Sequence, residues 1–336
     1  NGEIYNHLAL RRELEAAGHR FRSSHSDTEV LVHGYREWGA DLPLRLNGMY
    51  AFAIVDRPAG RVFLARDRFG EKPLYYARKP GILVFGSEAT SVLAHPAISS
   101  EISPRAIQKY FAWGFLPASN AFHRDLMKLP GGSSLTYDVA TDDLRIDNYW
   151  RFHLEPDERL TDEDRLAEEL RERLANSVRR RLMSDAPLGI FLSGGIDSAA
   201  VLAAATRALP TDSINTFTIG FTEPSYDESG HARMLAEAFG VRHHEKILDL
   251  EKARSALPCV LNKLDEPIGD SSILPTYLLS AFAAKHVKVA LSGDGGDELF
   301  AGYDPFRALA PARLYSTLVS RGVHRGLRKF ADLLPR

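Results

Sequence analysis

The chain has 336 residues, of which 44% are hydrophobic, and its formal net charge at pH 7 is -2. These values are typical of a soluble globular protein with about two domains, and they argue against an electrostatic nucleic-acid binder. No apolar run of about 18 residues could cross a membrane, and a single cysteine excludes an intrachain disulfide and favours a reducing, cytoplasmic setting.

The first segments of the chain predict two helices. Apolar residues recur at helical spacing over 6–19 and again over 26–39. Asn6 is the expected N-cap of the first helix, and Ser26 or Asp27 caps the second. A glycine near the end of each stretch stops the helix.

Short strands follow these helices. GMYAFAIVD (48–56) and RVFLARD (61–67) are separated by RPAG, which predicts a β-hairpin. PLYYA (73–77) and ILVFGSE (82–88) predict two further strands. Residues 1–150 therefore indicate a first domain with an antiparallel α+β layer arrangement.

The composition changes near 150–165, where a polar, acidic and proline-containing stretch reads as a domain edge. In the second domain, residues 151–336, apolar strands alternate with helices, which predicts an α/β doubly wound parallel sheet. Ligands of such sheets lie beyond the carboxyl ends of the strands. The expected strands cover 187–192, 214–221, 242–248 and 287–293, and the expected helices cover 161–182, 197–209, 228–240, 250–263 and 273–286.

The stretch FLSGGIDS is the most specific in the chain, since it follows an apolar strand and opens a helix. Ser193, Gly194 and Gly195 can form a tight turn with bare backbone N–H groups. The positive end of the helix that starts near Asp197 adds to a phosphate site, and Ser198 adds a hydroxyl. The spacing differs from a Walker A loop. The alternative is a strand-to-helix turn whose glycines serve packing.

A second glycine-rich stretch, LSGDGGDELFAGY (291–303), also follows a predicted strand. Its acids Asp294, Asp297 and Glu298 would repel a triphosphate unless a cation lies between them. Mg²⁺ usually takes one or two carboxylates together with phosphate oxygens. We therefore expect Asp197 and Asp297 to be the metal carboxylates. The alternative is a surface Asp/Gly turn.

Four motifs together carry a family resemblance. SGGIDS resembles the pyrophosphate loop of the ATP pyrophosphatases. NGEIYN at the front, RDRFGEKPLYY (66–76), LSGGIDS and LSGDGGDELFAGY, in this order, resemble glutamine-hydrolysing asparagine synthetases. The resemblance covers nearly the whole chain. It implies N-terminal-nucleophile glutaminase layers over 1–150, followed by a synthetase domain of the ATP pyrophosphatase type over 151–336.

The resemblance also implies a reaction. Glutamine is hydrolysed in the first domain, and an internal tunnel carries ammonia to the second. There Mg-ATP adenylates the aspartate side chain, and ammonia displaces AMP after pyrophosphate has left. The implied cofactors are ATP and Mg²⁺, and the implied partners are the small molecules glutamine, aspartate and ATP. Relatives are often dimers, so a homodimer stays open.

The resemblance assigns four residues to glutamine. Asn1 and Gly2 match the oxyanion hole, through the Asn side-chain amide and the Gly backbone N–H. Glu3 and Asp27 match the acids that hold the α-ammonium group of glutamine. From the residues alone, either acid could instead be a helix-terminus acid, and Asp27 could be an N-cap.

Further matches lie in the second half. Phe191 and Ile219 occupy positions that line the adenine pocket, and Ser292 and Gly293 match residues near the ribose and adenylate. Asp294 stands where many members have Glu, and a catalytic role beside the ammonia or adenylate survives that change. An acid here favours an ammonia-using enzyme over β-lactam synthetase, which has Tyr at this place.

The segment DEPIGDSSILPTY (265–277) connects the two glycine-rich loops of the second half. The resemblance places Asp270, Ser271 and Ser272 near the acceptor pocket. An N-cap at Ser271 or Ser272 is an equally good account of the two serines.

Three family features are expected outside this sequence: the nucleophilic N-terminal Cys, the Arg that clamps the glutamine carboxylate, and the catalytic Lys. Cys259 lies in the apolar run ALPCVL and is expected to be a core residue. RKFADLLPR is expected to be cut helical material. The resemblance thus implies an internal fragment that neither hydrolyses glutamine nor makes asparagine.

Two alternatives stay open at this stage. One is a related glutamine-dependent amidotransferase, or a β-lactam-synthetase-like ligase, that acts on another carboxylate. The other is a non-catalytic relative that keeps the fold for nucleotide binding or assembly.

Overall fold

The computed structural model describes residues 1–157, 159–184, 186–223, 227–248, 250–320 and 322–325. Contacts within the chain gather into two compact units. Unit 1 comprises Asn1–Asp185 and Ile247–His286, and unit 2 comprises Ala186–Lys246 and Val287–Arg336. The domain division expected at residue 150 stays a prediction. RKFADLLPR lies outside the described residues.

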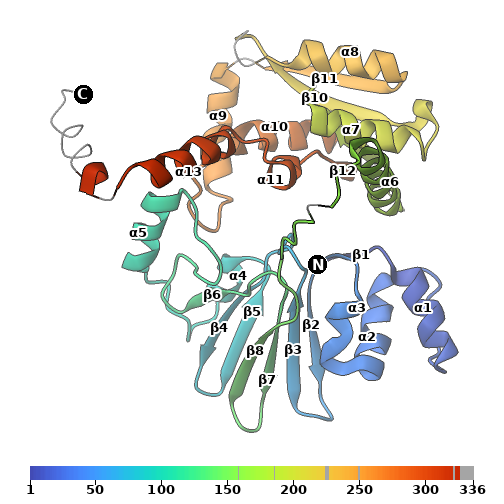
Figure 1. The fold of residues 1–336 in the computed structure, drawn as a ribbon. Coiled ribbons are helices and arrows are strands. Elements are labelled where there is room, and N and C mark those ends of the chain that lie inside the picture. The colour runs from blue at the N-terminus through green and yellow to red at the C-terminus, as the bar shows by residue number, and fades with distance from the viewer. Residues whose placement is uncertain (158, 185, 224–226, 249, 321, 326–336) are drawn as a thin grey trace. The chain divides into compact units, whose positions relative to one another are not determined.

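Unit 1 contains two antiparallel sheets (Figure 1). The first has the strand order β1-β2-β3-β7-β8, and the second has the order β5-β4-β6. Neighbouring strands within them pair antiparallel, as the α+β prediction requires. The strands are β1 (Gly2–Ile4), β2 (Gly48–Asp56), β3 (Arg61–Arg66), β4 (Tyr75–Lys79), β5 (Ile82–Gly86), β6 (Leu126–Lys128), β7 (Ser133–Asp138) and β8 (Asp143–Asn148).

Alternation along these strands builds a layered core. In β3, Phe63 packs into a cluster with residues of the first helices, whereas Leu64 packs into a cluster shared by both sheets. In β4, Tyr76 joins that inter-sheet cluster, and Ala77 packs beside α4 (Ala89–Leu93). Successive strand residues point to opposite faces, so the two sheets have helices on their outer sides.

The remaining helices of unit 1 include the predicted pair at the front (Figure 1). Ser26 caps the second helix by accepting the Glu29 N–H, so Asp27 is its first residue rather than its cap. The Asn6 side chain bonds Arg45 and Asn47 and does not cap the first helix. These helices are α1 (His7–Ala16), α2 (Asp27–Trp38), α3 (Leu42–Arg45), α5 (Pro104–Trp113), α6 (Glu163–Arg181), α9 (Leu250–Leu261) and α10 (Ile273–Ala283).

Unit 2 contains a four-stranded sheet with the order β11-β10-β9-β12 (Figure 1). β9 pairs in parallel with both β10 and β12, which confirms the predicted parallel sheet. Its strands are β9 (Leu188–Phe191), β10 (Asn215–Phe221), β11 (Arg242–Leu248) and β12 (Val289–Leu291), and its helices are α7 (Ile196–Thr206), α8 (Ser229–Phe239), α11 (Gly296–Phe300), α12 (Asp304–Arg307) and α13 (Leu309–Leu318).

The expectation that Cys259 is a core residue is wrong. Cys259 is exposed, and its Sγ lies 3.5 Å from the hydroxyl of Tyr277. Its neighbour Val260 is the buried residue of this turn. Successive residues of an α-helix are rotated by about 100°, so burial of Val260 turns Cys259 away from the core.

No helix in the described part of the chain is both long enough and apolar enough to span a membrane.

Candidate functional site

The SGGIDS loop connects β9 to α7 in unit 2, at the carboxyl end of a parallel strand. Two hydroxyls organise it. The Ser193 Oγ lies 3.0 Å from the Ser198 Oγ and accepts the Gly195 N–H at 3.2 Å. Ser198 is buried and donates to the Gly195 carbonyl at 3.1 Å. The serines therefore hold the loop in one tight shape.

Gly194 explains why the loop needs glycine. Its φ is +89°, which L side chains rarely adopt. A Cβ at this position would lie 2.7 Å from the Cβ of His231 and 3.0 Å from the backbone N of Ala232. The loop thus lies directly against the first turns of α8, and no side chain fits between them.

The start of α7 is free of a side-chain cap. Its N-cap is Gly195, which has no side chain to cap the helix. The first N–H groups of a helix have no partner inside the helix, and the helix dipole makes them attractive to anions. Ser193 and Gly195 are also exposed, so an anion can reach this end of the helix.

The second glycine-rich loop packs onto the first. It follows β12, which is the neighbour of β9 in the sheet. A Cβ at Gly293 would lie 2.7 Å from the Ser198 N, and a Cβ at Gly296 would lie 2.4 Å from the Asp197 Cγ. The predicted pyrophosphate loop and the predicted acidic loop therefore meet at one edge of one sheet, with the Asp197 carboxylate between them.

The predicted metal carboxylates are compatible with Mg²⁺. Asp197 lies against Gly296, and Asp297 is the next residue along the chain. The Asp297 carboxylate is turned towards Gly302, where any Cβ would lie 1.9 Å from its Oδ1. Among the described residues there is no group of three or more metal-binding side chains. A carboxylate pair is nonetheless the donor set that Mg²⁺ takes when phosphate oxygens supply the remaining ligands.

The other predicted residues of this loop lie beside these groups. The Ser292 hydroxyl donates to the Asp294 carboxylate at 2.8 Å, and Asp294 is exposed. Phe191 ends β9 and is paired in register with Phe217 of β10, the strand that also carries Ile219. Both Phe191 and Ile219 are half-buried, so part of each side chain is open to a ligand.

The predicted glutamine residues lie along β1 in unit 1. Gly2 has a φ of +136°, and a Cβ there would lie 2.1 Å from the Met49 carbonyl oxygen, so only glycine fits this pairing with β2. The Asn1 side-chain amide donates to the Ser87 hydroxyl at 3.3 Å. No local sequence pattern marks Ser87 as a partner of Asn1, because the two lie 86 positions apart.

Glu3 and Asp27 are brought close to each other. The Asp27 carboxylate accepts the N–H of Ile4, the residue after Glu3, at 3.0 Å. Glu3 itself is half-buried. This bond ties β1 to the start of α2, and it places the Asp27 carboxylate beside the strand that carries Glu3.

The connecting segment belongs to unit 1. Asp270 accepts the Ser272 N–H at 2.8 Å, and both serines, Ser271 and Ser272, are exposed. Ser272 occupies the N-cap position of α10 that the sequence offered as an alternative, but its side chain does not cap the helix.

RDRFGEK folds into a loop in which two charged side chains, Arg66 and Asp67, bond the backbone. Arg66 donates to three backbone carbonyls, those of Lys72, Gly70 and Leu129, at 2.6 to 2.7 Å. Asp67 is buried and accepts four backbone N–H groups. Burial lowers the pKa of Arg66. These two charges therefore serve the loop rather than a ligand.

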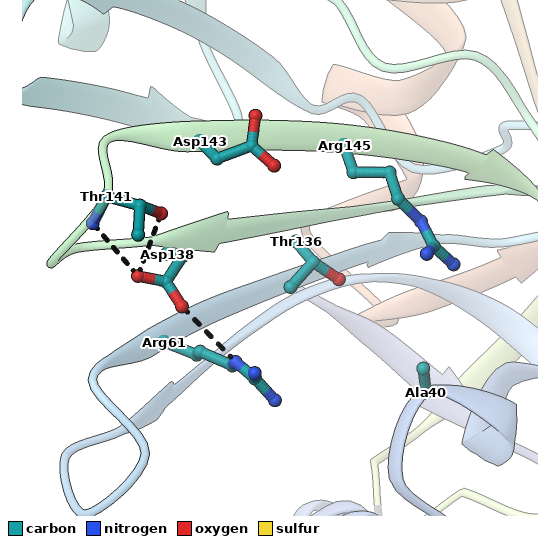
Figure 2. A pocket seen from close by; sticks show the side chains of 7 residues that line it. All are labelled: Ala40, Arg61, Thr136, Asp138, Thr141, Asp143 and Arg145. Carbon is teal, nitrogen blue, oxygen red and sulfur yellow. Dashed lines mark hydrogen bonds and ion pairs between the residues drawn. The ribbon is translucent and has the colours of Figure 1, made fainter.

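A surface cavity of about 350 Å³ lies over β3, β7 and β8 (Figure 2). Two of its charged side chains, Asp138 and Arg61, pair with each other. Asp138 accepts from Thr141 at 3.1 Å and pairs with Arg61 at 3.6 Å, and the bonds from Thr141 lower the pKa of Asp138. No predicted site residue lines this cavity, so the candidate chemistry lies elsewhere.

Comparisons with known proteins agree with this geometry. Residues 169–335 match the family model described as asparagine synthase, and residues 1–150 match the model described as a glutamine amidotransferase domain. "Asparagine synthetase [glutamine-hydrolyzing] 1" of Bacillus subtilis (strain 168) is 36% identical over 336 residues, covering 100% of this chain and 52% of that protein. "Asparagine synthetase [glutamine-hydrolyzing] 3" of the same organism is 33% identical over 324 residues, covering 91% of this chain and 51% of that protein.

The chain spans about half the length of the curated relatives it matches. These matches define a glutamine amidotransferase domain, which holds the antiparallel sheets, followed by an asparagine synthase domain, which holds the parallel sheet. The chain belongs to the family of glutamine-hydrolysing asparagine synthetases.

Proposed function

We propose that the complete protein carrying these residues makes asparagine from aspartate, with ATP as energy source and glutamine as ammonia donor. The observation that carries the proposal is the SGGIDS cradle of unit 2. There the uncapped start of α7, the positive-φ Gly194 and the Asp197 carboxylate meet at the carboxyl end of a parallel strand. A packing turn has no need for an exposed anion site beside a carboxylate.

On the glutamine side, the Asn1 amide and the Gly2 N–H would stabilise the oxyanion that forms when the glutamine amide is attacked. Two such donors each contribute on the order of a few kcal/mol to lowering the barrier. Glu3 and Asp27 would hold the α-ammonium group, since a pair of carboxylates suits a cation. Their common attachment to β1 supports this assignment.

On the synthetase side, Ser193, Gly194, Gly195 and Ser198 would hold the β- and γ-phosphates of ATP. Mg²⁺ bound to Asp197 and Asp297 would neutralise the phosphate charge. A carboxylate is a poor electrophile until one oxygen becomes part of a leaving group, so adenylation prepares the acceptor for ammonia.

The remaining residues of the site would complete the pocket. Phe191 and Ile219 would contact the adenine, and Ser292 and Gly293 the ribose and adenylate. We propose aspartate as the acceptor, with Asp294 beside the ammonia. The bond from Ser292 to Asp294 supports a fixed position for that carboxylate.

The 336-residue chain is proposed to bind Mg-ATP by itself. A cytoplasmic location and a homodimer are part of the same proposal.

The test uses two proteins. The complete gene product is incubated with Mg-ATP, glutamine and aspartate, and we expect asparagine, glutamate, AMP and pyrophosphate in equal amounts. If a different carboxylic acid is amidated in place of aspartate, that acid is the acceptor and the proposal of aspartate is wrong. The 336-residue chain is titrated with Mg-ATP, and absence of binding at millimolar nucleotide in a folded sample would contradict the cradle.

A further inference from the structure

The DEPIG stretch, residues 265–269, is attached to α4 by one carboxylate. The two oxygens of Asp265 accept the N–H groups of Ala89 at 2.8 Å and of Thr90 at 3.2 Å. These are the first two residues of α4, and Ala89 is buried. A carboxylate at this place satisfies two N–H groups that the helix cannot satisfy itself, and it complements the helix dipole.

Two further bonds fix the same stretch. Glu266 forms an ion pair with Lys128 at 2.5 Å, and the Lys128 ammonium also donates to the Leu116 carbonyl at 2.7 Å. The Gly269 N–H donates to the Gly114 carbonyl at 2.7 Å. Both partners of the ion pair are largely buried, with 12% and 21% of their side chains exposed. DEPIG is therefore held at three points and cannot shift freely against α4.

The residues just before α4 lead to the candidate oxyanion donor. Ser87 lies two residues before Ala89, and its hydroxyl accepts from the Asn1 side-chain amide. Gly86 packs against α4 so closely that a Cβ there would lie 2.2 Å from the Ser91 Oγ. Ser91 in turn donates to the Glu88 carbonyl at 2.6 Å. Residues 86–91 thus form one tightly packed turn. Asp265 bonds its residues Ala89 and Thr90, and Asn1 bonds its residue Ser87.

We infer that Asp265 is a positioning residue for glutamine hydrolysis, acting through α4 and Ser87 on the Asn1 amide. The inference rests on the proposed function. It also links a residue from the synthetase half of the sequence to the glutaminase site. Loss of the carboxylate releases the start of α4, Ser87 moves with it, and the Asn1 amide is no longer held where the oxyanion develops. An oxyanion donor acts mainly in the transition state, so its misplacement lowers kcat rather than raising KM.

The first experiment measures glutamine hydrolysis by the complete protein. Asp265→Ala is expected to lower kcat by about 3- to 10-fold with KM within about 2-fold of wild type. Ser87→Ala is expected to give a similar loss. Because both act on the same amide, the double variant is expected to lose no more than the Ser87→Ala variant alone.

The matched control is Asp125→Ala. Asp125 also lies in unit 1, accepts the Ser99 N–H at 3.0 Å and pairs with Lys79 at 2.7 Å, but it does not bond α4. We expect this variant to lose stability as Asp265→Ala does, while its kcat stays within about 2-fold of wild type. An equal fall of kcat in both variants would mean general destabilisation and would overturn the positioning role.

A second readout needs no activity. In the ¹⁵N-labelled 336-residue chain, Asp265→Ala is expected to shift the side-chain amide resonance of Asn1, whereas Asp125→Ala leaves it in place. An unmoved Asn1 resonance, or kcat losses that add in the double variant, would overturn the inference. A wild-type complete protein that does not hydrolyse glutamine would overturn the proposed function, and the inference with it. Normal hydrolysis with an unaffected Asp265→Ala variant would overturn the inference alone.

Discussion

Two loops of this molecule, RDRFGEK in unit 1 and SGGIDS in unit 2, use polar residues in opposite ways. In the first, the buried Asp67 gives both carboxylate oxygens to backbone N–H groups of its own fold. In the second, Ser193 and Gly195 stay exposed and the first turn of α7 has no side-chain cap. Both loops resemble family motifs, but only the second leaves donors available to a ligand.

The surroundings of RDRFGEK extend the contrast. The Tyr149 hydroxyl donates to the Arg66 carbonyl at 2.6 Å and lies 2.9 Å from the Tyr50 hydroxyl. Burial raises the pKa of Tyr149, and it raises the pKa of Tyr50 to about 12. Both tyrosines therefore stay neutral hydrogen-bonding groups at ordinary pH. Charged groups that find their partners inside the fold, as Arg66 and Asp67 do, stabilise the protein, and a motif with open donors is a candidate for binding.

The largest effect is expected from Asp67→Ala. The substitution leaves four backbone N–H groups without an acceptor, at a cost of at least about 1 kcal/mol for each one. We expect unit 1 to lose at least about 4 kcal/mol of unfolding free energy. All three tryptophans, Trp38, Trp113 and Trp150, lie in unit 1, so urea unfolding followed by tryptophan fluorescence measures this loss directly.

Asp138→Ala is the control for that experiment. Asp138 also accepts bonds from Ala140 and Thr141, but it lies at the surface, where water can replace the lost acceptor. Its loss of stability is expected to be much smaller. Equal losses for the two aspartates would remove the distinction between a buried structural carboxylate and an exposed one.

The next effect concerns the open loop. Gly194→Ala forces a side chain into a φ of +89° and places its Cβ 2.7 Å from His231. We expect the affinity of the chain for Mg-ATP, measured by calorimetry, to fall by at least about 10-fold, because the backbone N–H groups of the loop must move. Tryptophan-monitored unfolding of unit 1 is expected to stay unchanged.

Gly60→Ala is the control, because it strains a positive φ without creating a steric contact. Gly60 also has a positive φ, +64°, but a Cβ there would meet nothing within 4 Å. It is expected to leave Mg-ATP affinity at the wild-type value. Should Gly194→Ala bind Mg-ATP as tightly as Gly60→Ala does, the loop is a packing turn and the comparison fails.

A smaller effect is expected for Asp197→Asn. The amide keeps the size of the side chain but removes the charge that faces Gly293 and Gly296. We expect Mg-ATP to bind about 5- to 10-fold more weakly, and the dependence of binding on Mg²⁺ to become shallower. Asp212→Asn, on the exposed turn Thr211–Ser213, serves as control and should bind as wild type does. An unchanged Mg²⁺ dependence in Asp197→Asn would remove Asp197 from the metal site.

The sequence predicted the regular elements well where burial is strongly patterned. β2 covers Gly48–Asp56 and β10 covers Asn215–Phe221, close to the predicted stretches 48–56 and 214–221. β8, Asp143–Asn148, gave no such signal because DLRIDN is an edge strand with four of its six residues exposed, and its shape depends on pairing with β7. Helix α5 carried a readable signal, a Ser103 cap followed by Pro104 and ended by Gly114.

The candidate sites also differ in how far the sequence alone could predict them. SGGIDS could be predicted because its glycines, hydroxyls and helix start are adjacent in the sequence, so local geometry makes the site. The bonds from Asn1 to Ser87 and from Ala89 to Asp265 join residues 86 and 176 positions apart. Only the tertiary fold brings such pairs together, and no local pattern marks them.

The smallest effect is expected for Glu29, whose carboxylate bonds the fold as that of Asp67 does but is only partly buried. Glu29 accepts the Arg22 N–H at 2.6 Å and the Ser23 N–H at 2.8 Å, and the Ser23 hydroxyl donates to it as well. These bonds, with that of Arg22 first, lower the pKa of Glu29 to about 2. A carboxyl whose folded pKa is depressed stabilises the fold above its unfolded pKa of about 4.3, and this contribution is lost as the pH falls towards 2.

Glu29→Gln is therefore expected to have a lower Tm than wild type at pH 7, and the difference is expected to shrink between about pH 4.5 and pH 2. Thermal unfolding of unit 1 at several pH values, followed by tryptophan fluorescence, measures this convergence. Glu172→Gln, on the exposed face of α6, is the control and should match wild type throughout. A Tm difference for Glu29→Gln that stays constant down to pH 2 would mean that the side chain acts through its shape rather than through its charge.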